Sequence, residues 1–212
     1  AEILTDLKRL LPGDIAYGHV HALPGAVAFL CQPGVAAYFI LRDPRDVAVS
    51  HVHYITEMAP SHIHHRYYQE KLGSFDERLS ASIQGVPVEG LQTIANTPIL
   101  EPLPDICARF EPYLAWLDAP EVLSLRYEDF ITGREDAVGR VFDHATQRGF
   151  KPTCSRRQAI QALVESIDPQ RSPTFRSGKI GGWQKVFTPE HKQLFKKLSS
   201  DLLVRLGYEA DL

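Results

Sequence analysis

The sequence predicts an α/β fold in which helices cover a central parallel sheet. Short apolar segments rich in strand formers alternate with segments whose apolar residues recur at helical spacing, and turn residues separate the two kinds. The chain has 212 residues, 44% of them hydrophobic, which is enough for one sizeable core. We therefore expect a single domain over residues 1–212.

Two strands are expected in the N-terminal part of the chain. Pro12 and Gly13 end a first helix, and the apolar segment after them predicts a strand. A second apolar segment ends at Leu41, just before an Asp-Pro pair that suits the start of a helix. In chain order we expect a helix over residues 3–11, a strand over 14–20, a short helix over 24–30, a strand over 35–41 and a helix that begins after Asp43 and Pro44.

The C-terminal part contains a third strand and several amphipathic helices. Residues 58–104, rich in Pro, His, Tyr and Gly, show no clean periodicity and are expected to form short helices and loops over the sheet edge. The final helix starts after Thr188 and ends at Gly207. The other expected elements are a helix over residues 106–117, a strand over 122–126 and helices over 135–146 and 157–166.

Composition excludes several classes of protein. A net charge of −3 and a pI near 6.3 argue against nucleic-acid binding, which normally needs a basic excess. No apolar run approaches the length of a membrane span, so no membrane partner is expected. Three cysteines without metal-ligand spacing are typical of reduced thiols, which predicts a cytoplasmic protein. The oligomeric state is not predicted.

The segment YFILRDPRDVAVSHVHY, residues 38–54, predicts a grip on an anion. An apolar strand leads directly into Arg42, and Ser50 follows on the next helix, nearly two turns along. A guanidinium presents a planar fork to phosphate oxygens, and a nearby hydroxyl can donate to the same group. The alternative is an ordinary strand-helix junction in which Arg42 pairs with Asp43 or Asp46.

A second segment, FRSGKIGGW over residues 175–183, places Arg176, Ser177 and three glycines just before the last helix. Glycines let backbone amides approach an oxyanion closely. Taken alone, the segment could equally be a flexible loop with a solvated arginine.

Together the two segments resemble the 3'-phosphate site of sulfotransferases that use 3'-phosphoadenosine 5'-phosphosulfate (PAPS). The resemblance implies that Arg42 and Ser50, together with Arg176, Ser177 and Gly178, hold the 3'-phosphate. The match to the family pattern Arg-Lys-Gly-x-x-Gly-Asp-Trp has two departures: Ser177 stands where Lys is usual, and Gly182 stands where Asp is usual. Lys179 is a candidate to restore the missing charge.

The same resemblance implies a three-layer α/β/α, P-loop-nucleotide-kinase-like sulfotransferase fold. It also implies PAPS as the sulfuryl donor, PAP as the product, and a small-molecule acceptor with a hydroxyl or amine. Residues 58–104 would then form a lid over the acceptor. The acceptor-pocket candidates are Tyr54, His62, Tyr67 and Tyr68.

His19 is the candidate general base, because it follows the apolar residues 15–18 at the expected C-terminal edge of the sheet, where α/β proteins bind ligands. Sulfotransferases carry their catalytic His within Gly-His-Leu-Pro or a similar sequence. Gly18 and His19 match that pattern, but Leu and Pro are displaced to positions 23 and 24. His21 therefore remains a rival.

Tyr127 is the candidate for the adenine end of the nucleotide. It lies in LRYEDF, residues 125–130, just after the predicted strand over 122–126, and the segment resembles the Tyr-Glu-Asp of the family. An aromatic wall with a polar tip suits adenine.

Two other functions compete with this interpretation. The first is a metal-dependent hydrolase that uses the His-x-His clusters, although His51 and His53 lie two apart on a predicted helix and cannot face one ion. The second is a nucleotide-binding module without catalysis. We expect no metal at the site.

The opening of a typical sulfotransferase has no counterpart before His19. That opening contains a strand, a phosphate-binding loop of the type Pro-Lys-Ser-Gly-Thr-Thr-Trp with a catalytic Lys, and a helix. We therefore expect the sequence to represent a domain without its first strand, its phosphate loop and most of its first helix.

Overall fold

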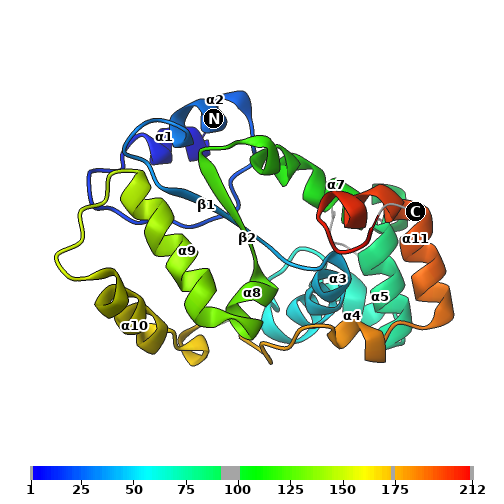
Figure 1. Ribbon diagram of the computed structural model, residues 1–212. Helices are drawn as coiled ribbons and strands as arrows, with labels where there is room; N and C mark the ends of the chain where they lie inside the picture. The colour runs from blue at the N-terminus through cyan, green and yellow to red at the C-terminus, as the bar shows by residue number, and fades with distance from the viewer. Residues whose placement is uncertain (1, 92–100, 173–174, 211–212) are drawn as a thin grey trace. The chain divides into compact units, whose positions relative to one another are not determined.

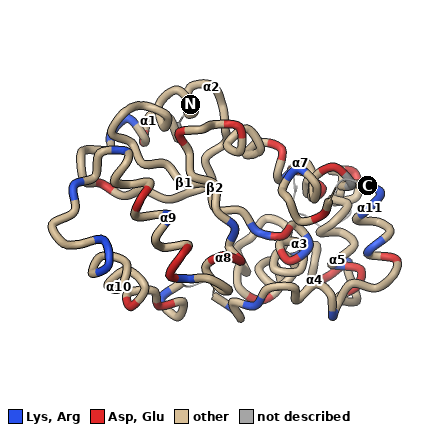
Figure 2. Tube along the Cα trace, viewed as in Figure 1, with Lys and Arg blue, Asp and Glu red and all other residues tan. Residues whose placement is uncertain are grey.

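The computed structural model describes residues 2–91, 101–172 and 175–210 (Figure 1). The chain divides into two compact units, each built from two stretches of sequence. Unit 1 contains Ala1–Leu41 and Glu111–Pro169, and unit 2 contains Arg42–Phe110 and Gln170–Leu212. Charges of both signs are interspersed along the trace (Figure 2).

Unit 1 contains a two-stranded parallel sheet, which confirms the α/β class and two of the predicted strands. Strand β1 (Ala37–Leu41) pairs with β2 (Val122–Arg126), in a register that aligns Ala37 with Val122 and Leu41 with Arg126. Ala37 and Leu41 are buried while Ile40 is 56% exposed, as expected for alternate residues of a pleated strand.

The helices of unit 1 pack into two apolar clusters. Trp116 is buried against Val122 and Ala26, and its Nε1 donates to the carbonyl of Val20 at 2.8 Å. In the second cluster, Val138 and Phe142 pack against Ile160, and this contact joins the helices over residues 134–147 and 156–166. The helical elements are α1 (Glu2–Leu7), α2 (Pro24–Leu30), the 3-10 helix η2 (Glu111–Asp118), α8 (Tyr127–Thr132), α9 (Arg134–Gln147) and α10 (Arg156–Ser166).

The predicted strand over residues 14–20 is wrong. The structure has no regular element there, and Ile15 and Tyr17 are 94% and 102% exposed. An extended segment becomes a strand only when its backbone groups pair with a neighbour. Among the described residues, the sheet pairs only β1 with β2, so this segment has no ladder.

The predicted helix over residues 106–117 is split by the structure. An α-helix, α7 (Ile106–Phe110), belongs to unit 2, and η2 continues from Glu111 in unit 1. Pro112 has no amide hydrogen to extend the α-helical pattern, which accounts for the change at this point.

Unit 2 is helical, and its last helix starts after Thr188 as the sequence predicts, with the Thr188 side chain as the cap of α11. Ser74 and Glu77 form a capping box at the start of α5, within the part of the chain where the sequence showed no clean periodicity. The elements are α3 (Pro44–His53), the π-helix η1 (Tyr54–Met58), α4 (His65–Glu70), α5 (Phe75–Gln84), α6 (Val88–Leu91), α7, the 3-10 helix η4 (Gly182–Lys185), the 3-10 turn η3 (Pro169–Arg171) at the boundary of the units, and α11 (Pro189–Arg205).

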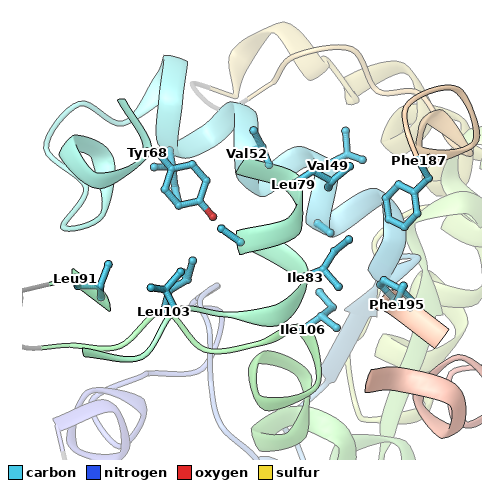
Figure 3. Close-up of a cluster of buried hydrophobic side chains, with 14 of the residues drawn as sticks. Val49, Val52, Tyr68, Leu79, Ile83, Leu91, Leu103, Ile106, Phe187 and Phe195 are labelled. Atoms are coloured by element: carbon cyan, nitrogen blue, oxygen red, sulfur yellow. The ribbon is translucent and has the colours of Figure 1, made fainter. Parts of the chain in front are cut away.

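The core of unit 2 lies where α3, α5 and α11 pack together (Figure 3). Val52, Leu79 and Ile83 are almost fully buried there, and Phe187 and Phe195 close the cluster from the C-terminal side. The buried face of α3 belongs to this core, and Arg42 lies just before the first turn of the helix. No helix in the described ranges has both the length and the apolar character needed to cross a membrane.

Candidate functional site

The site begins at the N-terminus of α3, which starts as the sequence predicts. Asp43 is the N-cap, and its Oδ1 accepts a hydrogen bond from the Arg45 amide at 2.9 Å. Pro44 occupies the first helical position, where its missing amide hydrogen costs nothing. This tight turn places Arg42 directly before a helix N-terminus, where the backbone favours an anion.

Arg42 contacts the second predicted segment. Its Nη2 donates to the carbonyl oxygen of Lys179 at 2.8 Å, across 137 residues of sequence. The same nitrogen lies 3.9 Å from the Asp46 carboxylate. The pairing of Arg42 with Asp46, which the sequence left open as an alternative, is therefore also present, as a long ion pair. The structure therefore brings the Arg42 turn and the glycine loop together.

Asp46 makes the closest contacts to that loop, and sequence analysis missed this role. Its Oδ2 accepts from the Gly181 amide at 2.7 Å, and its Oδ1 accepts from the Trp183 amide at 2.9 Å. The residue is only 3% exposed. One signal could have revealed it, because a carboxylate one helical turn after Arg42 must find donors if it is buried.

The glycine loop, residues 175–183, has the backbone geometry that its composition predicts. Gly178 and Gly181 adopt φ values of 61° and 67°, a region that favours glycine. Arg176 is exposed, whereas Ser177 and Gly178 are half-buried. An exposed guanidinium beside a tightly turned, partly covered backbone fits an oxyanion ligand such as a phosphate.

Arg45 holds the end of the loop. Its guanidinium lies 4.1 Å from the centre of the Trp183 ring, and it forms ion pairs of 2.8 Å with Asp43 and with Glu209. The Arg45 and Asp43 side chains are only 13% and 10% exposed, so this pair is shielded from water, whereas the Glu209 side chain is 51% exposed.

The other sequence-predicted residues occupy different places. Ser50 is half-buried on α3, and within the described residues its side chain makes no hydrogen bond to the loop. His19, His21 and Tyr127 belong to unit 1. His19 and His21 are both exposed, with ring centres 6.3 Å and 5.1 Å from that of Tyr113, and Tyr127 begins α8 directly after β2.

His51 of α3 is hydrogen-bonded to Ser82 of α5. Ser82 Oγ donates to the Ala48 carbonyl, so it accepts the proton of His51 Nδ1, which lies 3.0 Å away. Burial, followed by the charges of Arg109, His62 and His64, lowers the pKa of His51 to about 2, which keeps the ring neutral.

The predicted divergence of His51 and His53 is confirmed, because His53 turns instead to Glu57, with Nδ1 2.8 Å from the carboxylate. Among the residues that the structure describes, no three His, Cys, Asp or Glu side chains are arranged to hold a metal ion.

Comparison with known proteins confirms the family predicted from the two motifs. The model of the sulfotransferase domain family matches residues 37–207. Among solved structures, retinol dehydratase with androsterone and inactive cofactor PAP has a TM-score of 0.57 and 21% identity, over 94% of this chain and 56% of that one. A second structure of retinol dehydratase, with retinol and PAP, gives 0.53 and 22%, over 85% and 49%.

The mouse sulfotransferase SULT7A1 with PAP gives a TM-score of 0.51 and 16% identity, over 83% of this chain and 61% of that one. These likenesses confirm the sulfotransferase fold, and the chain spans about half of the length of the retinol dehydratase structures. No match was found among curated proteins.

Proposed function

The chain belongs to the sulfotransferase domain family, and on that premise we propose that it binds PAPS and transfers the sulfuryl group to a hydroxyl or amine of a small-molecule acceptor. The observation that carries the proposal is the contact between Arg42 and the glycine loop, which joins the two phosphate-binding segments in unit 2.

In this proposal, the 3'-phosphate is held by two groups of residues. Arg42 and Ser50 contribute a guanidinium and a hydroxyl from the start and middle of α3. Arg176, Ser177 and Gly178 contribute a second cation, a second hydroxyl and backbone amides from the loop. Charge-assisted hydrogen bonds of this kind are stronger than neutral ones, and they need no metal ion.

The proposed reaction is an in-line attack of the acceptor oxygen or nitrogen on the sulfur of PAPS. The new bond to sulfur forms as the bond to the 5'-phosphate oxygen breaks, and PAP departs with that electron pair. His19 accepts the proton of the acceptor, with His21 as the alternative base. Tyr127 contacts the adenine ring. The family membership supports these roles.

The acceptor is proposed to lie against residues 58–104 and the adjoining helix, where Tyr54, His62, Tyr67 and Tyr68 are the candidates. Androsterone and retinol, named with the two retinol dehydratase structures, support a small organic acceptor. The three free cysteines support a cytoplasmic location.

The proposal is tested by calorimetric titration of the chain with PAP and with AMP, which lacks the 3'-phosphate. We expect PAP to bind at least about tenfold more tightly, the equivalent of one charge-assisted hydrogen bond. Equal affinities for the two nucleotides would overturn the assignment of the 3'-phosphate site. Turnover with PAPS and a panel of alcohols and amines then identifies the acceptor.

A further inference from the structure

Asp46 places a negative charge beside the proposed phosphate site. Its carboxylate is 3% exposed and lies 3.9 Å from Arg42, the residue proposed to hold a phosphate. A buried negative charge costs free energy, and this one also repels any anion that Arg42 attracts. A carboxylate at this position must therefore contribute something that offsets both effects.

That contribution is visible in what the carboxylate holds. Its two oxygens accept from the amides of Gly181 and Trp183, at 2.7 and 2.9 Å. Arg42 meanwhile donates to the carbonyl of Lys179. Three alternate residues of the loop are thus tied to Arg42 and to the first turn of α3, and Gly178 immediately precedes the first of them.

Gly181 explains why a carboxylate is needed. Its φ of 67° turns the backbone into the left-handed region, and a Cβ built on it would find no atom closer than 4.0 Å. No neighbouring side chain therefore crowds the turn. The hydrogen bonds that Asp46 accepts from Gly181 and Trp183, with that of Arg42 to Lys179, tie this stretch of the backbone to the start of α3.

We propose that Asp46 is a positioning residue: it fixes the glycine loop so that Arg176, Ser177 and Gly178 meet the 3'-phosphate, and it thereby sets the preference for 3'-phosphorylated nucleotides. This inference rests on the proposed function. It assigns to Asp46 no contact with the nucleotide.

Two substitutions separate geometry from charge. D46N keeps the shape but loses one of the two acceptors, because its amide group presents N–H to an N–H of the loop. D46E keeps the charge but moves both oxygens by one methylene. The matched control is D105N, because Asp105 is also a carboxylate of unit 2 that accepts one backbone amide, that of Ala108 at 2.8 Å, and it does not touch the loop.

The measurement is the dissociation constant for AMP divided by that for PAP, and both are obtained by calorimetry for each variant. We expect D46N and D46E to lower this ratio about tenfold, the equivalent of about 1.4 kcal/mol. AMP affinity should stay within about twofold of wild type, and D105N should leave the ratio unchanged. A residue that serves only stability would lower the melting temperature without changing the ratio.

Three outcomes overturn the inference. An unchanged ratio in D46N and D46E would show that the loop does not depend on Asp46. Tighter PAP binding by D46N would show that relief of repulsion outweighs positioning. Loss of the folded state in both variants, seen by circular dichroism, would assign Asp46 to folding. If wild type itself does not distinguish PAP from AMP, the proposed function fails instead.

Discussion

The guanidinium of Arg45 stacks on the ring of Trp183, 4.1 Å from its centre, while the same side chain pairs with Asp43 and Glu209. This arrangement connects the N-cap of α3, the end of the glycine loop and the segment after α11. A cation enclosed in this way gains both from the aromatic face and from two carboxylates.

The first prediction concerns Arg45. Arg45→Ala should lower the free energy of unfolding by about 1–3 kcal/mol, because it removes the stacking on Trp183 and the guanidinium that pairs with the buried Asp43 carboxylate. Urea denaturation measures the change. Arg9→Ala is the control, since the Arg9 side chain is 75% exposed and its pairing with Asp6 is a surface contact. Equal losses in the two variants would contradict the structural role of Arg45.

The second prediction concerns the two arginines of the proposed phosphate site. Arg42→Ala and Arg176→Ala should each weaken PAP binding by about 1.5–3 kcal/mol, the range for a hydrogen bond to a charged group. AMP binding should change much less. Calorimetry provides both values, with Lys192→Ala on the exposed face of α11 as a control for net charge. If neither arginine affects PAP affinity, the phosphate lies elsewhere.

Much of the local structure around this site was predictable, because it depends on residues that are close together in the sequence. The Asp43-Pro44 cap, the strand before Arg42 and the glycines after Arg176 each follow from short-range chemistry. Asp46 was missed for the opposite reason. Its partners, Gly181 and Trp183, are 135 and 137 residues away, and a polar residue on a helix normally faces solvent.

The third prediction separates the two candidate bases. His19→Ala should reduce kcat by about 10²–10⁴-fold, the range for losing a general base, while the dissociation constant for PAP stays unchanged. His21→Ala should leave kcat nearly intact. Steady-state kinetics with PAPS and an acceptor that the wild-type protein sulfates gives kcat for wild type and for both variants. The reverse pattern would transfer the role of base to His21, and unchanged kcat in both would remove histidine from the reaction.

The fourth prediction concerns Gly85, which follows α5. Its φ of 73° and ψ of 176° lie in a region that is essentially restricted to glycine, and a Cβ would sit 2.5 Å from the Leu103 carbonyl oxygen. Gly85→Ala should therefore destabilise the protein by more than about 2 kcal/mol. Gly13→Ala is the matched control, because Gly13 has a φ of 96° but nothing within 4 Å of the Cβ position. Similar melting temperatures for both variants would be inconsistent with the clash.

The fifth prediction is a loss of stability in acid. The folded-state pKa of His51 is lowered to about 2, far below its value of about 6.5 in an unfolded chain. Below pH 6.5 the unfolded state therefore binds a proton at His51 that the folded state does not bind. The free energy of unfolding should fall by about 1.4 kcal/mol for each pH unit below that value.

Denaturation midpoints between pH 7 and pH 4 test this directly. His51→Asn retains a donor for Ser82 but does not titrate, so its pH dependence should be shallower by about one proton. His53→Asn is the control, because His53 pairs at the surface with Glu57. Parallel curves for wild type and His51→Asn would show that His51 is not the group responsible.

The fold also contains elements that local sequence patterns predict and others that depend on residues distant in the sequence. Strands β1 and β2 were predicted as short segments of strand-forming residues, α9 and α10 from the helical spacing of their apolar residues, and α11 from that spacing together with its Thr188 start. Residues 14–20 have the composition of a strand, yet they form none, since pairing depends on a neighbour that composition does not reveal. Likewise the buried contact of His51 with Ser82 joins α3 to α5, which no local pattern indicates.

The bonds from Arg42 and Asp46 to the glycine loop also determine when the site can form during folding. They close a chain of 135 to 137 residues, and the first contact to join its two ends, one of these bonds or a core contact, carries an entropic cost of about 4 kcal/mol. The others then form without closing a new loop, so the set assembles as one cooperative step. A nascent chain cannot take that step until Trp183 has left the ribosome.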